Sequence, residues 1–220
     1  MIAKELINFN IPSLKISDSV EKAIDLMDFY KVQQLVLADN ENYLGLISLE
    51  ILENQLDQNN LLIDLLPEFP NTFAKEGQHV LELLNIVQQN NIEVLGVVDQ
   101  DFSFIGSITK TDLIFQFSNL LGNELGAILV LAINDRDYSL AEIARLIEQN
   151  DTKILSSFYS KPTNSESQNT LTLKLNRTEI GRSVATLERF GYDIIASYAN
   201  EPIESVEKER YDLLIKYLEM

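Results

Sequence analysis

A segment in the first half of the chain occurs twice, about sixty residues apart. The matches are Val20, Ile24 and Met27 with Val80, Leu84 and Val87, Val32–Asp39 with Ile92–Asp99, and Gly45–Ser48 with Gly106–Thr109. A period of this length indicates one supersecondary unit copied once, in which each copy needs the other to bury its apolar face. Two copies around a pseudo-two-fold axis leave paired clefts, which are more typical of small-ligand binding than of catalysis.

Composition sets the broad class of the protein. At 220 residues the chain is long enough for two small domains, each with its own core. It has no run of about eighteen apolar residues, so we expect no membrane span. Its first residues lack the basic region and apolar core of a signal peptide. The chain has no cysteine, which excludes disulfide and thiolate chemistry and fits a cytoplasmic location.

The acidic charge is unevenly placed. Residues 1–125 carry six lysines and no arginine against 19 acidic residues, a net charge of −13. Residues 126–220 carry 11 basic and 15 acidic residues, a net charge of −4. A field of this sign repels phosphate backbones, so we expect no nucleic-acid binding. The simplest interpretation of the acidic surface is solubility.

Each repeat is predicted to run helix, strand, turn, strand, helix. In the first repeat, Asp18 and Glu21 form a capping-box pattern that opens a helix. Residues 35–37 read as a short buried strand, and Ser48 is expected to cap a second helix after the next strand. The second repeat follows the same order. Residues 54–71 are interpreted as a connector with one or two helical turns.

This pattern resembles a tandem pair of cystathionine β-synthase (CBS) domains. The resemblance covers residues 1–122, with repeats at about 1–57 and 66–122. It depends on an apolar strand, an Asp, a turn and a Gly-x-Ile-[Ser/Thr] motif in each copy. The resemblance implies a non-enzymatic regulatory protein that senses an adenosine-containing ligand in the cleft of the pair. A degenerate adaptor that binds a partner protein and no small molecule is the alternative hypothesis.

The second half predicts a different domain. Its expected elements are a strand at 127–133, a helix opened by Ser139 and Glu142, strands at 153–159 and 171–175, a helix at 179–190 and a strand at 193–198. The order βαββαβ predicts a ferredoxin-like domain over residues 126–200, and the fold class is therefore α+β. With Asp135-Arg136 before the first helix, this half resembles an ACT domain, an amino-acid-sensing module. Residues 201–220 are predicted to add an amphipathic helix.

The combination of a CBS pair with an ACT-like domain is similar to the acetoin-utilisation protein B family. In amino-acid-binding ACT domains a glycine usually follows the first strand, whereas this chain has Tyr138. A side chain there blocks the approach of a ligand carboxylate, so we expect a structural pairing role instead. Both halves favour two-fold association, and we therefore predict a homodimer. The regulated protein is not indicated by the sequence.

The clearest candidate ligand residues are Thr109 and Asp112, with Lys110 between them. The resemblance implies that the hydroxyl lies near a ligand phosphate and that the carboxylate binds ribose hydroxyls. A carboxylate accepts well from vicinal hydroxyls, and a helix N-terminus offers N–H groups to an anion. Thr109 and Asp112 also form a capping-box pattern, which needs no ligand. Both interpretations remain open at this point.

The first repeat departs from the motif. Ser48 keeps the hydroxyl, but Ile51 replaces the aspartate and cannot accept hydrogen bonds, so we expect at most one nucleoside site. Lys15 and Lys75 join Lys110 as candidate phosphate-binding residues, whereas His79 is predicted to cap or flank a helix. Because cations are scarce, S-adenosylmethionine or magnesium-bound ATP fits this background better than free AMP. No resident cofactor, metal site or catalytic residue is predicted.

Overall fold

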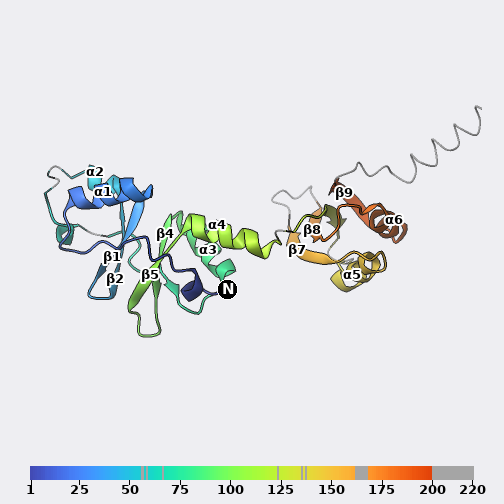
Figure 1. Ribbon diagram of the computed structural model, residues 1–220, viewed down its shortest axis with the longest axis horizontal. Coiled ribbons are helices and arrows are strands. Elements are labelled where there is room, and N and C mark those ends of the chain that lie inside the picture. The colour runs from blue at the N-terminus through green and yellow to red at the C-terminus, as the bar shows by residue number, and fades with distance from the viewer. Residues whose placement is uncertain are drawn as a thin grey trace, which may run out of the picture. The chain divides into compact units, whose positions relative to one another are not determined.

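The computed structural model describes residues 1–55, 57, 59–65, 67–122, 124–134, 136, 138–161 and 168–199. The chain divides into two compact units, Met1–Ser118 and Asn119–Met220, which are coloured blue to green and yellow to red in Figure 1. The elements of the first unit are η1 (Ala3–Leu6), α1 (Val20–Tyr30), β1 (Gln34–Asp39), β2 (Asn42–Ser48), α2 (Leu49–Glu53), η2 (Leu62–Asp64), β3 (Ala74–Lys75), α3 (Val80–Asn90), β4 (Val94–Val98), β5 (Phe104–Thr109) and α4 (Lys110–Leu120).

The two repeats adopt the same local structure. Each contains an 11-residue helix, α1 or α3, followed by an antiparallel hairpin and a second helix. Both helices end at a residue in the left-handed region, Lys31 at φ 55° and Asn91 at φ 50°. The connector contains one short helical turn, η2, as the sequence predicted.

One predicted helix cap was wrong by one residue. Ser19, not Asp18, is the N-cap of α1, and its hydroxyl accepts from the Lys22 N–H at 3.2 Å. The Asp18 carboxylate instead accepts from the Lys15 N–H at 2.9 Å and forms an ion pair with the Lys22 ammonium. Asp18 and Ser19 are neighbours, and both residue types can cap a helix. The ion pair with Lys22 holds the Asp18 side chain in the turn before the helix, which leaves Ser19 as the cap.

The leading segment of each repeat crosses to the hairpin of the other. In the first repeat, the Asn8 N–H donates to the Ser107 carbonyl on β5 at 2.8 Å. In the second repeat, Glu68 forms two backbone hydrogen bonds with Leu46 on β2, both of 2.7 Å. Gly45 and Gly106 make room for these segments. At Gly106 the φ is +152°, and a Cβ would lie 2.4 Å from an Ile7 side-chain carbon. Each repeat forms its own sheet, β1-β2 or β3-β4-β5, and the crossing segment of the other repeat is hydrogen-bonded to its hairpin.

The repeats also share a core around the pseudo-two-fold axis. The Gln33 N–H donates to the Glu93 carboxylate, and the Glu93 N–H donates to the Gln34 amide oxygen, both at 2.9 Å. Buried side chains of the first hairpin, including Leu46, pack in one cluster with those of the second repeat. The expectation that each copy buries the apolar face of the other is confirmed.

The second unit has the predicted βαββαβ order. Its elements are β6 (Ile128–Ile133), α5 (Leu140–Glu148), β7 (Ile154–Ser160), β8 (Asn169–Leu175), α6 (Gly181–Arg189) and β9 (Asp193–Tyr198). The sheet order is β7-β8-β6-β9, and all three neighbouring pairs are antiparallel. The Ser139 hydroxyl caps α5, as predicted, by accepting from the Glu142 N–H at 3.3 Å. Helix α6 begins two residues later than predicted, with Ile180 at its N-cap.

The two faces of this sheet differ. Alternate leucines of β6 and β8 are buried in one cluster with the apolar sides of α5 and α6. On the other face, Ile128 and Tyr198 lie opposite each other on β6 and β9 and are 36% and 63% exposed. Ile195 on β9 and Phe158 on β7 are also exposed. The predicted helix at 201–220 lies outside the described residues.

Candidate ligand-binding sites

The Thr109–Asp112 pair lies where β5 passes into α4. The Asp112 N–H donates to the Thr109 hydroxyl oxygen at 3.0 Å. In return the Asp112 carboxylate accepts from the Thr109 N–H at 3.1 Å and from the Thr109 hydroxyl at 2.6 Å. These reciprocal bonds form a complete capping box, so the predicted capping box is confirmed.

A third hydrogen bond to the Asp112 carboxylate comes from a residue far away in the sequence. The side-chain amide of Asn8 donates to Asp112 Oδ2 at 3.1 Å. All three bonds to the carboxylate end on Oδ2, and within the described part of the chain Oδ1 accepts none. Asp112 is only partly buried. The carboxylate is therefore held in one orientation while one of its oxygens remains able to accept from a ligand.

Asn8 was not among the predicted site residues. It lies in the leading segment of the first repeat, and its contact with Asp112 spans 104 positions, which no local pattern reveals. The repeat was the signal that could have drawn attention to Asn8, because the residue at the matching position of the second repeat is Glu68. Asn8 and Glu68 are sixty positions apart, which is the period of the repeat itself.

The equivalent place in the first repeat is built differently. Ser48 caps α2 by accepting from the Ile51 N–H at 3.4 Å, so the predicted cap is confirmed. Glu68 replaces Asn8 on the crossing segment, and Ile51 replaces Asp112 on the helix. The carboxylate oxygen Oε2 of Glu68 is buried and has no hydrogen-bond partner among the described residues. The two places therefore carry different chemical groups. That only the second repeat binds a nucleoside stays a prediction.

The predicted cations are dispersed. Lys110 follows Thr109 directly and has an exposed side chain, while its N–H donates to the Glu93 carbonyl at 2.7 Å. Lys15 lies in the first repeat with its N–H bonded to Asp18, and no contact joins it to Thr109. His79 is the N-cap of α3 and accepts from the Leu81 N–H at 3.4 Å, which agrees with its predicted capping role.

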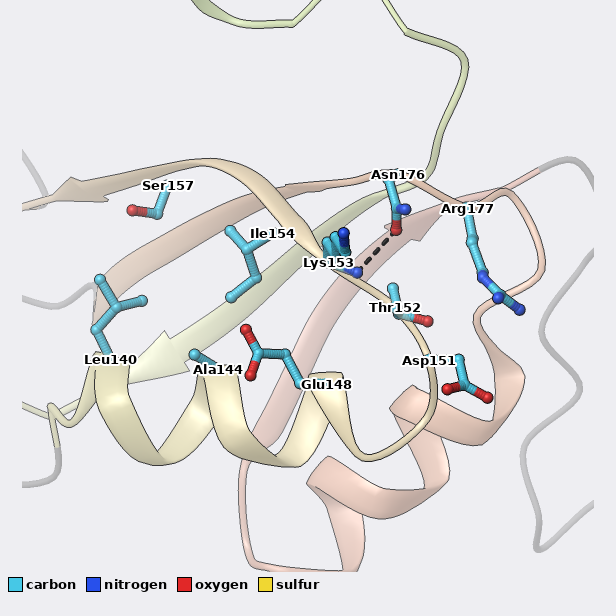
Figure 2. A pocket seen from close by; sticks show the side chains of 10 residues that line it. All are labelled: Leu140, Ala144, Glu148, Asp151, Thr152, Lys153, Ile154, Ser157, Asn176 and Arg177. Carbon is cyan, nitrogen blue, oxygen red and sulfur yellow. Dashed lines mark hydrogen bonds between the residues drawn. The ribbon is translucent and has the colours of Figure 1, made fainter.

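The second unit holds a pocket of about 830 Å³ between α5, β7 and the loop after β8 (Figure 2). Leu140, Ala144 and Ile154 form its apolar part. Its polar part carries two acidic side chains, two basic side chains and an amide, namely Glu148, Asp151, Lys153, Arg177 and Asn176. Asn176 accepts from the Lys153 N–H at 2.7 Å and so ties the start of β7 to the end of β8. The opposite charges balance, which disfavours a ligand with a large net charge.

A smaller pocket of about 550 Å³ lies at the turn between β6 and α5. It is lined in part by Arg136, Glu142 and Tyr192, and the Tyr192 hydroxyl donates to the Glu142 carboxylate at 3.1 Å. Tyr138 also lines it, with its ring 5.0 Å from that of Tyr159. Asp135, named in the ACT-like motif, lies outside the described residues.

Among the described residues, no group of three His, Asp or Glu side chains is placed to hold a metal ion. Within those same residues, no helix combines the length and apolar character needed to cross a membrane.

Comparison with known proteins bears on the fold. Residues 3–53 match the model of the CBS domain. Inosine-5'-monophosphate dehydrogenase of Methanocaldococcus jannaschii is 28% identical over 113 residues, which are 51% of this chain and 23% of the enzyme. The chain therefore spans about a quarter of that relative.

Two solved structures are also similar. A CBS domain pair/ACT domain protein from Thermotoga maritima has a TM-score of 0.51 and 20% identity, with 56% of this chain and all of the other covered. CBSX2, crystallised with AMP, has a TM-score of 0.45 and 20% identity, with 54% of this chain and 96% of the other covered. The resemblance to acetoin-utilisation protein B remains a prediction. The chain has an α+β fold in which a CBS-domain pair is followed by a ferredoxin-like domain.

Proposed function

We propose that this protein is a non-enzymatic regulator whose CBS pair binds an adenosine-containing ligand beside Asp112. The supporting observation is the asymmetric use of the Asp112 carboxylate: among the described residues, three hydrogen bonds end on Oδ2 and none on Oδ1. An ionised carboxylate held in place by fixed donors is a strong acceptor for ribose hydroxyls. The 11-residue helix α4 starts beside this carboxylate, and its Lys110 and Asp112 N–H groups are bonded to the Glu93 carbonyl and the Thr109 hydroxyl.

The charge of the first unit narrows the ligand class. Residues 1–125 have a net charge of −13 and no arginine, and Lys110 is the cation next to the motif. Free AMP brings two negative charges into this field and is disfavoured. S-adenosylmethionine, with its cationic sulfonium, is better suited to this field. Magnesium reduces the charge of ATP from about −4 to about −2, the same as that of AMP, so magnesium-bound ATP gains no advantage over AMP from its charge. Ligand energy would act through different affinities for two arrangements of the protein in the cytoplasm.

A panel of ligands in a thermal-shift assay tests this proposal. The probes are S-adenosylmethionine, ATP with magnesium, and AMP, the ligand crystallised with CBSX2. A ligand present at a hundred times its dissociation constant adds about 2.7 kcal/mol of stability. For a chain of this size that is a rise of roughly 5–10 °C in Tm. If no adenine compound raises the Tm, the adaptor hypothesis replaces the sensor.

We also propose that the ferredoxin-like unit supports a homodimer. Ile128, Phe158, Ile195 and Tyr198 are exposed on the sheet face opposite the helices, and β7 ends the sheet as an edge strand. Apolar faces and open edges of this kind favour association with a second copy. The regulated partner would then meet a two-fold symmetric assembly.

Light scattering at micromolar concentration measures the predicted dimer. We expect a mass near twice the 25.0 kDa of the chain. A mass near 25 kDa would contradict the dimer. Deleting residues 205–220 tests whether that segment covers the exposed sheet face or forms part of the dimer interface. Removal of a cover over the sheet should promote association, whereas loss of an interface element should weaken it.

A further inference from the structure

A pocket in the first unit lies at the far end of β5 from Asp112. Its volume is about 690 Å³, within the range of small-molecule sites, and its walls come from η1, the turn after β3 and the turn between β4 and β5. The six residues of β5 separate this turn from Thr109 by roughly 17 Å at 3.3 Å per residue. The pocket is therefore separate from the site proposed for the adenosyl ligand.

Phe102 in this pocket has an unusual backbone. Its φ is +64°, in the left-handed region where a hairpin turn normally places glycine or asparagine. A bulky side chain is disfavoured there, yet the ring is 57% exposed rather than buried. The Phe73 ring packs edge-on against the Phe102 ring, with 6.0 Å between the ring centres. The Tyr43 ring packs edge-on against Phe73 in the same way, with 5.6 Å between the ring centres. The turn thus presents an oriented, exposed aromatic ring despite an unfavourable backbone conformation.

The charges around the ring leave one cation available. Lys75 Nζ lies 5.4 Å from the centre of the Phe102 ring, and within the described residues it forms no ion pair. The other lysine, Lys4, is paired with Glu76 at 2.8 Å. Asp99 uses one carboxylate oxygen to accept two N–H groups of its own turn at 2.9 Å. A ligand in the pocket therefore meets one ammonium group beside one aromatic ring.

We propose that this pocket binds a small aromatic carboxylate, with its ring against Phe102 and its carboxylate on Lys75. Aromatic rings attract each other in edge-on and offset geometries, which favours an aromatic over an aliphatic ligand. A single ammonium group balances one negative charge, and the nearby Glu76 and Asp99 disfavour a doubly charged phosphate. Two of the six lysines in residues 1–125 line this one pocket, so it is a local exception within an acidic region.

Calorimetry on the full chain tests the proposal with indole-3-acetate and two matched probes. Indole keeps the ring without the charge, and cyclohexanecarboxylate keeps the charge without the aromatic ring. We expect each matched probe to bind about tenfold more weakly than indole-3-acetate. An excess of S-adenosylmethionine should not displace the acid, because the two sites are separate.

Three variants locate the binding. Phe102→Gly removes the ring and suits the left-handed backbone, so the fold is retained while affinity falls about tenfold. Lys75→Met keeps the length of the side chain, removes the charge and lowers affinity by a similar factor. Lys31→Met, which breaks only a surface pair with Asp28, leaves affinity unchanged. Unchanged affinity in Phe102→Gly, equal binding of cyclohexanecarboxylate, or no binding of indole-3-acetate to the unaltered chain would each overturn the proposal.

Discussion

Replacement of Gly96 by valine should destabilise the first unit by about 2–3 kcal/mol, because the site has no room for a side chain. A Cβ at Gly96 would lie 2.5 Å from the Tyr43 ring and 3.5 Å from a Val36 methyl carbon. Tyr43 cannot swing away freely, since its hydroxyl hydrogen-bonds with the carbonyls of Thr72 at 2.7 Å and Phe69 at 3.2 Å. Burial also raises the pKa of the Tyr43 hydroxyl, so it remains a neutral donor.

Urea unfolding measures this effect, and Gly77→Ala is the matched control. A Cβ at Gly77 would meet no atom within 4 Å, so that variant should unfold close to the midpoint of the unaltered chain. In the double variant Gly96→Val, Tyr43→Ala the steric conflict disappears, and the two changes should be strongly non-additive. An unchanged urea midpoint for Gly96→Val would show that the repeats do not meet through Tyr43.

The repeat made much of this fold predictable. A helix, a hairpin and a second helix in one copy implied the same elements in the other, and side chains such as Ser48 and Ser139 correctly marked helix starts. In the second unit, alternation of leucines in β8 correctly predicted one buried face. These features depend on periodicity and local hydrogen bonds, which a sequence displays directly.

The missed features depend on tertiary contacts or on competition between neighbouring residues. Asn8 reaches Asp112 only because the leading segment crosses to the other repeat. Ser19 rather than Asp18 caps α1 because Lys22 draws the Asp18 carboxylate into an ion pair. Phe102 contradicts the local preference for glycine or asparagine in its turn. Departures from local rules of this kind tend to mark strained or functional positions.

The sequence singled out Asp112 as a candidate residue and left two roles open for it, helix capping and ligand binding. The structure gives it a capping role through Oδ2. Oδ1 accepts no hydrogen bond from the part of the chain that the structure describes, which allows a second role at the same time. The two roles can be separated because an amide side chain has nearly the same shape as a carboxylate. Its oxygen can still accept from Thr109, but its NH₂ group cannot accept from a ligand hydroxyl.

Asp112→Asn should therefore fold normally yet bind the adenosyl ligand about 10–100-fold more weakly, since a hydrogen bond to a charged group contributes roughly 1.5–3 kcal/mol. Asp112→Ala should abolish binding and also lower stability by about 1 kcal/mol through loss of the capping box. Ile51→Val, at the matching position of the first repeat, should leave affinity unchanged because that side chain offers no acceptor. Calorimetry with whichever adenine compound raises the Tm measures all three. Full affinity in Asp112→Asn would assign Asp112 to capping alone, because its only remaining contacts would be those with Thr109 and Asn8.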